Sequence, residues 1–450
     1  MKLKPELKTK CQAFSIITLG VASLYPNISA ANGYHFLHQS ATGMSTAYAT
    51  NGTGSRDISA MFSNPASLIR FDGTRASAGF VLDLPKSRLY NATATAPYTD
   101  GKVAVSGTPA EPKQPIDTAY GAATYLSHQV DPDLVLGVAF GAPYAYVSEY
   151  PETAVSRYTA TRTALTALNL SPSAAYRISP ELALGASLNF QYYTAGLDTM
   201  VATTTTPTVA TDVKSTIKAK DLSLGFSLGM EYQATPETRI GASFRSPIHH
   251  SFRGNAELTG TPANYAALVA TAKQLGVTIT NPKSRADFDI STPYMLQIGL
   301  AHKVNEQIEL YANANRFGWS AFKNTHIKYS NGLAETVVDN NWRDSWSTSI
   351  GFGYQHSPAL QIRAGMMYDW TPTPAPTVSP RAPNNDRWNI GTGFSYDIDK
   401  DWKVDVAYQY IQFTKVTIAL EGGNNIPRGN LHANLDLHAN VLMAQINRRF

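Results

Sequence analysis

Cysteine, charge and long apolar runs are all scarce in this 450-residue chain. It has one cysteine, Cys11, and only 16% of its residues are charged. After the first 31 residues, no segment approaches the roughly 18 consecutive apolar residues of a membrane-spanning helix. These absences exclude a disulfide framework and a helical membrane protein. The 10% aromatic residues and a mean hydropathy of −0.21 do not fit a disordered chain either.

The N-terminal residues have the pattern of a secretory signal. Four lysines precede an apolar run over 13–25, and the small residues Ser29-Ala30-Ala31 follow it. The run is too short for a membrane helix of about 20 residues, so residues 1–31 are predicted to be a signal peptide. Its removal takes away Cys11, four lysines and one glutamate, which lowers the formal net charge from +4 to +1. No basic patch remains that would indicate a nucleic acid partner.

The rest of the chain shows period-2 alternation, repeated from about residue 76 to the end. In 182–193, "LALGASLNFQYY", one set of residues is apolar and the other is small or polar, and 222–233, 360–370 and 402–410 follow the same pattern. A soluble β-sandwich also alternates, but its outer face would be rich in Lys and Glu. Segments of this length suit a tilted membrane strand of roughly 9–11 residues. The pattern therefore favours a transmembrane β-barrel.

Fourteen such segments are predicted as strands, at 76–85, 118–128, 134–147, 166–178, 182–194, 221–233, 237–246, 288–303, 306–319, 343–356, 359–370, 386–398, 401–413 and 438–450. The connections alternate between short turns such as "SPE" and long loops such as 247–287. Bacterial outer-membrane barrels have an even number of strands, short periplasmic turns and long outer loops. The predicted fold is therefore all-β, a 14-stranded antiparallel transmembrane β-barrel over 76–450, in the outer membrane of a Gram-negative bacterium.

The positions of the tryptophans and of the last phenylalanine also support this fold. All six tryptophans lie at or just beyond predicted strand ends, and five are expected in an outer aromatic girdle at the lipid head groups. The last predicted strand ends on Phe450, as expected if closing the barrel pairs it with the first strand. Such a terminal aromatic resembles the signal read by the outer-membrane assembly machinery. We expect that machinery, outer-membrane lipid and lipopolysaccharide to be partners.

Residues 32–75 precede the first predicted strand and show no alternation. They include "SNPASL", in which Asn64-Pro65 predicts a turn because Asn caps and Pro fixes φ. A fourteen-stranded lumen is wide enough to need filling. Asn64, Pro65 and Ala66 are thus either an ordinary turn or the centre of a plug.

Several motifs occur in a fixed order along the chain: Gly33-Tyr34, "SNPASL", "SPSAAYRIS" before "LALGASLNF", "TRIGASFRSPIHH", "ELYANANRFGWSAF", "MMYDWTPTPAP", "PNNDRWNIGTGFSY" and the closing Phe450. With these motifs the chain resembles the FadL/TodX family of outer-membrane transporters for long-chain fatty acids and other hydrophobic compounds. The resemblance implies that residues 32–75 are an N-terminal hatch that plugs the lumen. It also implies that a hydrophobic small molecule binds at the outer loops, with Tyr34 among its contacts, and diffuses out sideways through a gap in the wall.

In family members that gap lies at a kink in the third strand. This chain has "AFGAPYAY" there, so Gly141 and Pro143 are the expected lateral opening. Pro lacks the amide N–H of the ladder, and Gly allows a bend. The alternative is a strand end that drifts into its loop.

The outer loops contain one predicted helix, in 262–277, "PANYAALVATAKQLGV". Its apolar stripe makes Leu268 and Leu275 candidate ligand contacts, unless the loop only packs on itself. The basic positions associated with carboxylate binding in the fatty-acid members fall on Thr199 and Val338, and neither residue is cationic.

Alternation places Asp369 and Arg387 on the lumen side of neighbouring strands, near their outer ends. "YDW" and "NDRW" match the family pattern, in which the aspartate lines the ligand pocket. The two residues either bind ligand or form an ion pair that braces loop 371–385. Since a paired Arg387 would leave no free cation for a carboxylate, neutral hydrocarbons are predicted to bind at least as well as fatty acids. Apolar transfer would supply about 0.8 kcal/mol per buried CH₂.

Catalytic patterns are missing from the sequence. The ten histidines are scattered without H-E-x-x-H, and no G-x-S-x-G occurs. No enzyme activity, metal site or cofactor is therefore predicted. Two alternatives to a transporter remain: a general porin, which would constrict with an inward-folded loop, and an outer-membrane lipid-modifying enzyme, which would need Ser and His together on its outer wall.

Overall fold

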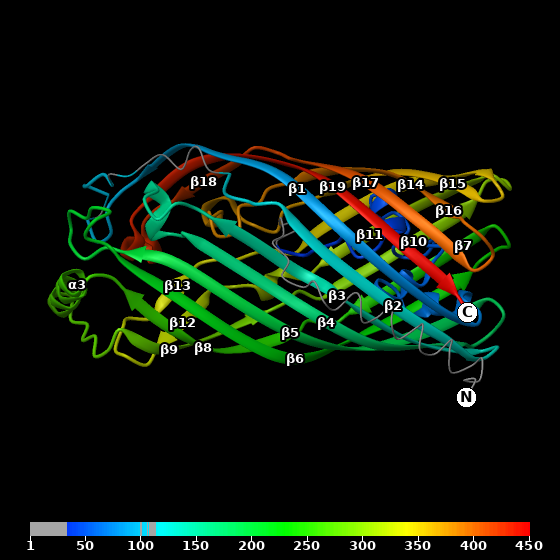
Figure 1. Ribbon diagram of the computed structural model, residues 1–450, viewed down its shortest axis with the longest axis horizontal. Coiled ribbons are helices and arrows are strands. Elements are labelled where there is room, and N and C mark those ends of the chain that lie inside the picture. The colour runs from blue at the N-terminus through cyan, green and yellow to red at the C-terminus, as the bar shows by residue number, and fades with distance from the viewer. Residues whose placement is uncertain (1–33, 100, 106, 108–113) are drawn as a thin grey trace, which may run out of the picture.

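The computed structural model describes residues 34–99, 101–105, 107 and 114–450. The predicted signal peptide, 1–31, lies outside these described residues. One antiparallel sheet closes on itself, because β1 (Thr74–Ala94) pairs with β19 (Leu431–Arg449) from Arg75↔Arg449 onward. The molecule is a long barrel with the C-terminus at one end and the large loops at the other (Figure 1).

The sheet has nineteen strand segments, which form the predicted fourteen wall strands and extend them at the loop end. The remaining wall strands are β2 (Ala119–Asp131), β3 (Leu134–Glu149), β4 (Arg162–Arg177), β5 (Leu182–Val201), β6 (Val213–Gln233), β7 (Thr238–Arg245) continued by β8 (His249–Thr259), β9 (Lys283–Ser291) continued by β10 (Met295–Lys303), β11 (Ile308–Phe317), β14 (Ser345–Ser357), β15 (Leu360–Asp369), β16 (Arg387–Asp397) and β17 (Trp402–Phe413). Short strands lie in the outer loops: β12 (Thr325–Tyr329), β13 (Thr336–Val338) and β18 (Val416–Leu420).

Helices are few and short in the residues that the structure describes. They are α2 (Ala41–Ser45), α3 (Pro262–Gln274) and the 3₁₀ turns η1 (Ile58–Phe62), η2 (Pro65–Arg70), η3 (Val155–Tyr158), η4 (Trp319–Ala321), η5 (Ala375–Thr377) and η6 (Gly423–Arg428). In the described part of the chain, no helix has the length and apolar character needed to cross a membrane.

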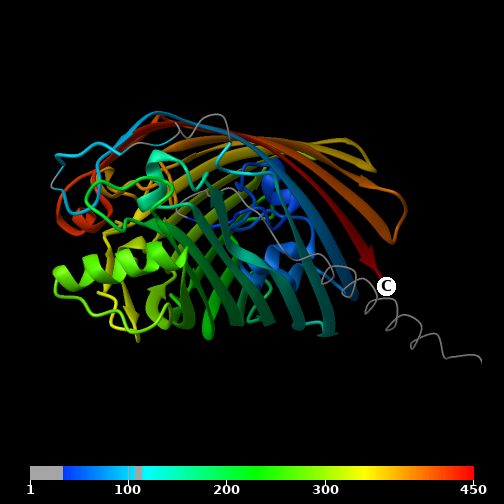
Figure 2. The same cartoon turned by 60° about the vertical axis from the view of Figure 1, so that its left-hand side comes forward.

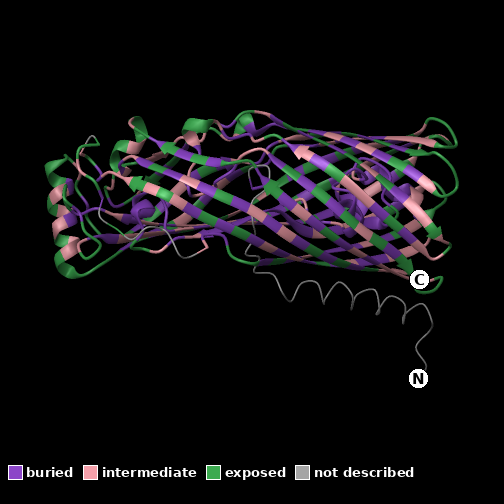
Figure 3. Ribbon diagram, turned by 90° about the horizontal axis from the view of Figure 1, so that it is seen from above, coloured by how far each residue is buried: buried purple, intermediate pink, exposed green. Residues whose placement is uncertain are grey.

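The alternation predicted from the sequence is confirmed along the wall. On β5, Leu184, Leu188 and Phe190 are exposed on the outer face, whereas Asn189 and Gln191 are buried. Figure 3 shows the resulting stripes of buried and exposed residues along the strands. Polar residues point inward and apolar residues outward, as a barrel in lipid requires.

Most strands extend further toward the outer loops than the sequence predicted. β6 begins at Val213 instead of 221, and β1 continues to Ala94 instead of ending at 85. The segment predicted as one strand, 288–303, is broken around Pro293, where the ladder lacks an amide N–H. Beyond the lipid, outward residues need not be apolar, so the ladder continues where the alternation stops.

Residues 34–73, here called the hatch segment, lie inside the barrel (dark blue in Figure 1). Asn64 organises its tightest turn: its side chain donates to Gly52 O at 2.9 Å and to Met230 O on β6 at 3.0 Å, and its Oδ1 accepts from the Ala66 amide. Gly185 on β5 lies so close to Pro65 and Ala66 that any Cβ there would overlap their backbone. The Asn64-Pro65-Ala66 turn therefore docks directly on the wall.

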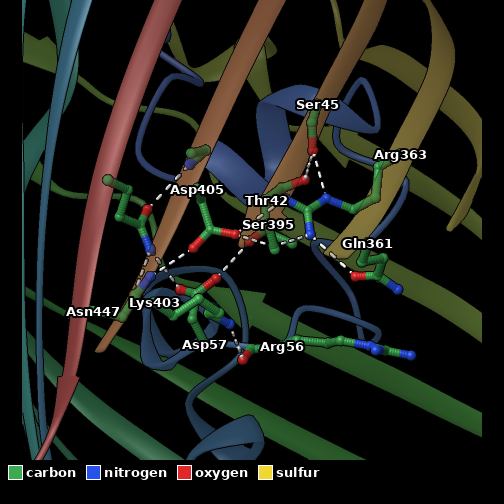
Figure 4. Close-up of polar contacts among 12 residues, drawn as sticks. Thr42, Ser45, Arg56, Asp57, Gln361, Arg363, Ser395, Lys403, Asp405 and Asn447 are labelled. Atoms are coloured by element: carbon green, nitrogen blue, oxygen red, sulfur yellow. Dashed lines mark hydrogen bonds and ion pairs between the residues drawn. The ribbon is translucent and has the colours of Figure 1, made fainter. Parts of the chain in front are cut away.

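A buried polar network ties the other side of the hatch segment to the wall (Figure 4). Asp57 accepts from Thr42 Oγ1 at 2.5 Å and from Gln445 Nε2 of β19 at 2.9 Å. Next to it, Arg363 of β15 donates to Ser45 Oγ at 2.9 Å and pairs with Asp405 at 3.1 Å. Hydrogen bonds to buried charged groups are among the stronger ones, so this network fixes the segment within the lumen.

Candidate functional site

A cavity of about 550 Å³ lies among the outer ends of the strands and the loops above them. Its wall is built from inward-facing apolar residues of the extended strands, which explains why the strands continue beyond the lipid. These residues include Leu165, Leu197, Ile217, Leu258, Phe288, Ile290 and Ile327. The volume falls within the roughly 300–1,000 Å³ of small-molecule sites, and the lining suits a hydrophobic ligand.

Tyr34, the first described residue, reaches this cavity from the hatch segment. Its ring packs in an aromatic cluster, with centroids 5.1 Å from Trp319, 5.5 Å from Phe322 and 5.6 Å from Trp342. The prediction that five tryptophans form the outer girdle was wrong for two of them, because Trp319 and Trp342 are buried in this cluster. Their strands end in loops that fold back over the lumen, which period-2 alternation does not reveal.

The helix predicted in the fourth outer loop is present as α3, capped by Thr261, whose side chain accepts from the Asn264 amide. It lies at the loop end of the barrel (Figure 2). Leu268 and Leu275 both line the cavity; Leu268 is buried, whereas Leu275 is 52% exposed. The middle of α3 thus contributes to the cavity wall, and the residue after its C-terminus lies at the rim.

Two arginines on the cavity wall, Arg381 and Arg428, were not predicted from the sequence. Arg428 donates to Val337 O at 3.1 Å and to Asn424 O at 2.9 Å. Arg381 forms no side-chain hydrogen bond or ion pair within the described residues, and its buried Nη1 has no partner there. Burial, together with the neighbouring Arg428, lowers the pKa of Arg381 to about 10. The guanidinium therefore remains charged at neutral pH and faces the cavity unpaired.

Asp369 and Arg387 are in register on β15 and β16, and they form the ion pair considered from the sequence. Arg387 Nε and Nη2 donate to Asp369 Oδ2 at 2.9 and 2.7 Å, and both side chains are 1% exposed. Neither residue lines the cavity. The expectation that no free cation is available was wrong, because it considered Arg387 alone. Thr199 and Val338 do line the cavity, as neutral residues.

Gly141 and Pro143 lie where the pairing between β2 and β3 stops. The last pair is Thr124↔Phe140, and the β3–β4 ladder has an irregularity between Gly141 and Tyr144. Among the described residues, β3 forms no strand pairs with β2 from residue 141 to 148, and the Glu149 amide then donates to Pro115 O, ahead of β2, at 2.8 Å. The two strands therefore separate at the kink.

The hatch segment fills this separation. The Phe36 amide donates to Pro143 O at 2.7 Å, and the Ala145 amide donates to Tyr34 O at 3.2 Å. Gln39 adds a side-chain link, since its Nε2 donates to Ala142 O at 2.8 Å and to Phe36 O at 3.1 Å. Gly141 leaves the room that the Gln39 side chain occupies. Sequence reasoning missed this pairing because 34–39 has no strand pattern.

Within the described residues, no group of three or more His, Cys, Asp or Glu side chains is placed to hold a metal ion. Besides apolar side chains and one aromatic cluster, the cavity lining has two guanidinium groups and one carboxylate, that of Glu335, whose Oε1 lies 3.0 Å from His326 Nδ1. This set can bind a small hydrophobic molecule, and it can hold one acidic group.

Comparison with known protein families gives one match over nearly the whole chain. Residues 22–450 match the model of the outer membrane protein transport protein family, OMPP1/FadL/TodX. A putative outer membrane protein of Neisseria meningitidis is 25% identical over 97% of this chain and 98% of its own length. The long-chain fatty acid transport protein of Escherichia coli is 22% identical over 85% of this chain and 87% of its own.

Solved structures agree on the fold. A FadL homologue of Pseudomonas aeruginosa superposes with a TM-score of 0.83 at 19% identity, covering 93% of this chain and 100% of its own. The Ralstonia pickettii toluene transporter TbuX gives a TM-score of 0.62 at 19% identity, covering 90% and 98%.

Proposed function

Because this chain belongs to the OMPP1/FadL/TodX family of outer membrane transport proteins, we propose that it takes up an amphipathic acid with a long apolar chain. The family membership makes it a multi-pass β-barrel of a Gram-negative outer membrane that transports hydrophobic small molecules. Membership of this family does not fit the two alternatives, a general porin and a lipid-modifying enzyme. The proposal adds the chemical class of the ligand, its binding site and its exit.

The cavity at the outer loops supports a capture role. Leu268, Leu275 and Tyr34 would contact the apolar chain, with Leu275 at the rim where a ligand arrives. Each CH₂ group removed from water contributes about 0.8 kcal/mol, so a chain of eight carbons gains roughly 6 kcal/mol before the entropic cost of binding.

The single observation that carries the choice of an acid is the unpaired Arg381. An unpaired guanidinium in an apolar cavity has given up part of its hydration without gaining a partner, and a carboxylate would supply one through bidentate hydrogen bonds. Arg428 adds a second positive charge on the same wall. A neutral hydrocarbon would leave Arg381 without a partner. This proposal therefore reverses the expectation that neutral hydrocarbons bind at least as well.

The exit proposed for the ligand is the separation between β2 and β3 at Gly141 and Pro143. Hatch residues 34–39 occupy it through a few hydrogen bonds, and Tyr34 in the same segment contacts the cavity. Movement of this one segment would therefore connect the cavity with the gap. We further propose that the hatch segment blocks axial flow, so that passive diffusion leads sideways into the membrane.

Two smaller roles complete the proposal. We assign no catalytic activity to the chain, in keeping with a family of transporters. Phe450, whose amide donates to Thr74 O at 2.9 Å next to the barrel seam, is proposed as the residue that the outer-membrane assembly machinery reads.

The test is competition of a matched alkane and alkanoate against a fluorescent hydrophobic probe, using purified protein in detergent. We expect the wild type to prefer the alkanoate, and Arg381→Gln to lose about tenfold or more of that preference, as expected for a charged hydrogen bond of about 1.5–3 kcal/mol. Arg381→Lys should retain part of it. Arg343→Gln, at an exposed arginine away from the cavity, is the matched control.

The pH dependence adds a second readout. Arg381 is charged below its pKa, so alkanoate binding should persist up to about pH 10 and weaken above it, whereas alkane binding should not change. Equal competition by alkane and alkanoate in the wild type would contradict the acid and restore a neutral ligand.

A further inference from the structure

Exposed cations gather on the outer surface of the barrel beyond its lipid-facing band. Along β6, the outward residues Leu228, Phe226, Leu224 and Leu222 are all exposed and apolar, and Lys220 and Lys218 then follow on the same face. Neighbouring strands contribute outward-facing cations at the same place. The resulting set, here called the basic ladder, consists of Lys218, Lys220, Arg253, Arg285 and Lys328.

Strand register brings these residues together. Lys220 on β6 is paired with Arg253 on β8, and Lys218 is paired with Asn255, which is itself paired with Arg285 on β9. Lys328 on β12 and Arg253 are both paired with Asp287. Directly opposed side chains on one face of a sheet have Cβ atoms about 4.5–5.5 Å apart. The ladder is therefore one continuous patch on four strands.

The ladder and the capture cavity occupy opposite faces of the same strands. Ile217, Phe288 and Ile327 point inward and line the cavity, whereas the ladder residues alternate with them and point outward. No ladder residue lines the cavity. The patch is thus separate from the site proposed for the transported ligand.

The positive charge of the ladder is poorly compensated. Within the described chain its one ion pair joins Arg253 to Asp287 at 3.4 Å, and Arg253 is still 74% exposed. Lys218, Lys220, Arg285 and Lys328 have no carboxylate within ion-pair distance there. Like charges directly opposed across strands, such as Lys220 and Arg253, destabilise a sheet unless an anion lies between them.

We propose that the basic ladder binds the phosphate groups of lipopolysaccharide in the outer leaflet. The patch begins where the apolar outward residues of β6 end, which is where the head groups of the surrounding lipid lie. Arg matches phosphate with its planar donors, and Lys adds point charge. The Lys220–Arg253 row and the Lys218–Arg285 row are about 7 Å apart along the strands, which suits a head group with more than one phosphate.

Lipopolysaccharide bound to the outer surface would reduce the electrostatic repulsion among the ladder cations on β6, β8, β9 and β12. These strands also form much of the cavity wall, so the lipid would stabilise the geometry of the capture site without contacting the transported ligand.

The test removes three ladder charges together, in Lys218→Gln/Lys220→Gln/Arg253→Gln. The matched control removes three exposed charges that lie outside the ladder, in Lys323→Gln/Arg343→Gln/Lys415→Gln. Each protein is extracted in mild detergent, and the lipopolysaccharide retained per barrel is measured by native mass spectrometry. We expect a severalfold loss in the ladder variant and no change in the control. Heat-modifiable gel mobility should be unaffected in both.

A second variant is needed if the triple variant folds poorly, and it should change lipopolysaccharide retention in the opposite direction. Asp287→Asn removes the acidic residue paired with Arg253 and should increase lipopolysaccharide retention. In refolded wild type, lipid A should bind more tightly than dephosphorylated lipid A or phosphatidylglycerol. Unchanged retention in the folded ladder variant, or equal binding of phosphatidylglycerol, would overturn the proposal.

Discussion

Variants of the buried ion pair between Asp369 and Arg387 can show whether these two residues stabilise the barrel or bind the ligand. Replacing Asp369 by Asn keeps the shape of the side chain but removes the charge that neutralises Arg387. Both side chains are 1% exposed, and two of the three guanidinium nitrogens of Arg387, Nε and Nη2, donate to Asp369 Oδ2. The variant would therefore leave a buried guanidinium without a counter-charge.

The expected cost follows from this burial. Breaking a buried pair by neutralising one partner typically destabilises by about 3–5 kcal/mol, because the remaining charge is uncompensated. Replacing both partners is expected to cost less than replacing either one, since the double variant Asp369→Asn/Arg387→Met buries no charge. The ring of Phe413, 5.6 Å from the guanidinium, already offers an apolar contact for the methionine.

Urea unfolding of the barrel in lipid vesicles, followed by tryptophan fluorescence, would measure these differences. The midpoint should fall in Asp369→Asn with an unchanged slope, and it should partly recover in the double variant. The control is Glu152→Gln, which breaks an exposed pair with Lys214 of 2.7 Å and should cost less than about 1 kcal/mol.

Ligand binding must be measured on the same variants. Neither Asp369 nor Arg387 lines the cavity, so the affinity for the fluorescent probe should stay unchanged in folded Asp369→Asn. Wild-type stability together with a large loss of affinity would refute the structural role and return both residues to the ligand site.

Two further predictions concern the hatch segment. Gln39→Ala removes donors to Ala142 O and Phe36 O, at about 1 kcal/mol each, so probe uptake should rise by up to roughly thirtyfold if the segment gates the exit; unchanged uptake in Gln39→Ala would place the exit elsewhere. Gly185→Val would overlap the backbone of Pro65 and Ala66 and should displace the hatch segment, raising conductance in planar bilayers, whereas outward-facing Ala186→Val should not; equal conductance in the two would contradict a plug.

The barrel was predictable from the sequence because lipid imposes a strict requirement on each wall strand. Outward residues such as Leu184 must be apolar and their neighbours need not be, so the period-2 pattern is visible without any structure. Where the strands rise beyond the lipid this requirement ends. The pattern is lost at Lys220 and Lys218, although the hydrogen-bonded ladder continues to Val213.

The candidate site was only partly predictable for a related reason. Leu268 and Leu275 were found because a helix has its own periodicity. The Asp369–Arg387 pair was found because consecutive strands are antiparallel neighbours and alternation places both residues on the lumen side near the outer ends. Arg381 lies in an irregular loop, where no period indicates which way a side chain points. Its approach to the cavity depends on long-range folding of that loop.

The pairing of the hatch segment with β3 has a consequence for how the chain folds. Without the hatch segment, β3 would present unpaired backbone groups toward β2 between Gly141 and Ala145, and an open strand edge is a template for pairing with other chains. Phe36 covers the Pro143 carbonyl, and Tyr34 accepts from the Ala145 amide. A segment that precedes the first wall strand thus protects the edge that the kink creates. A chain that inserts before this segment docks would expose that edge, so truncating residues 34–39 should promote aggregation during assembly as well as leakage afterwards.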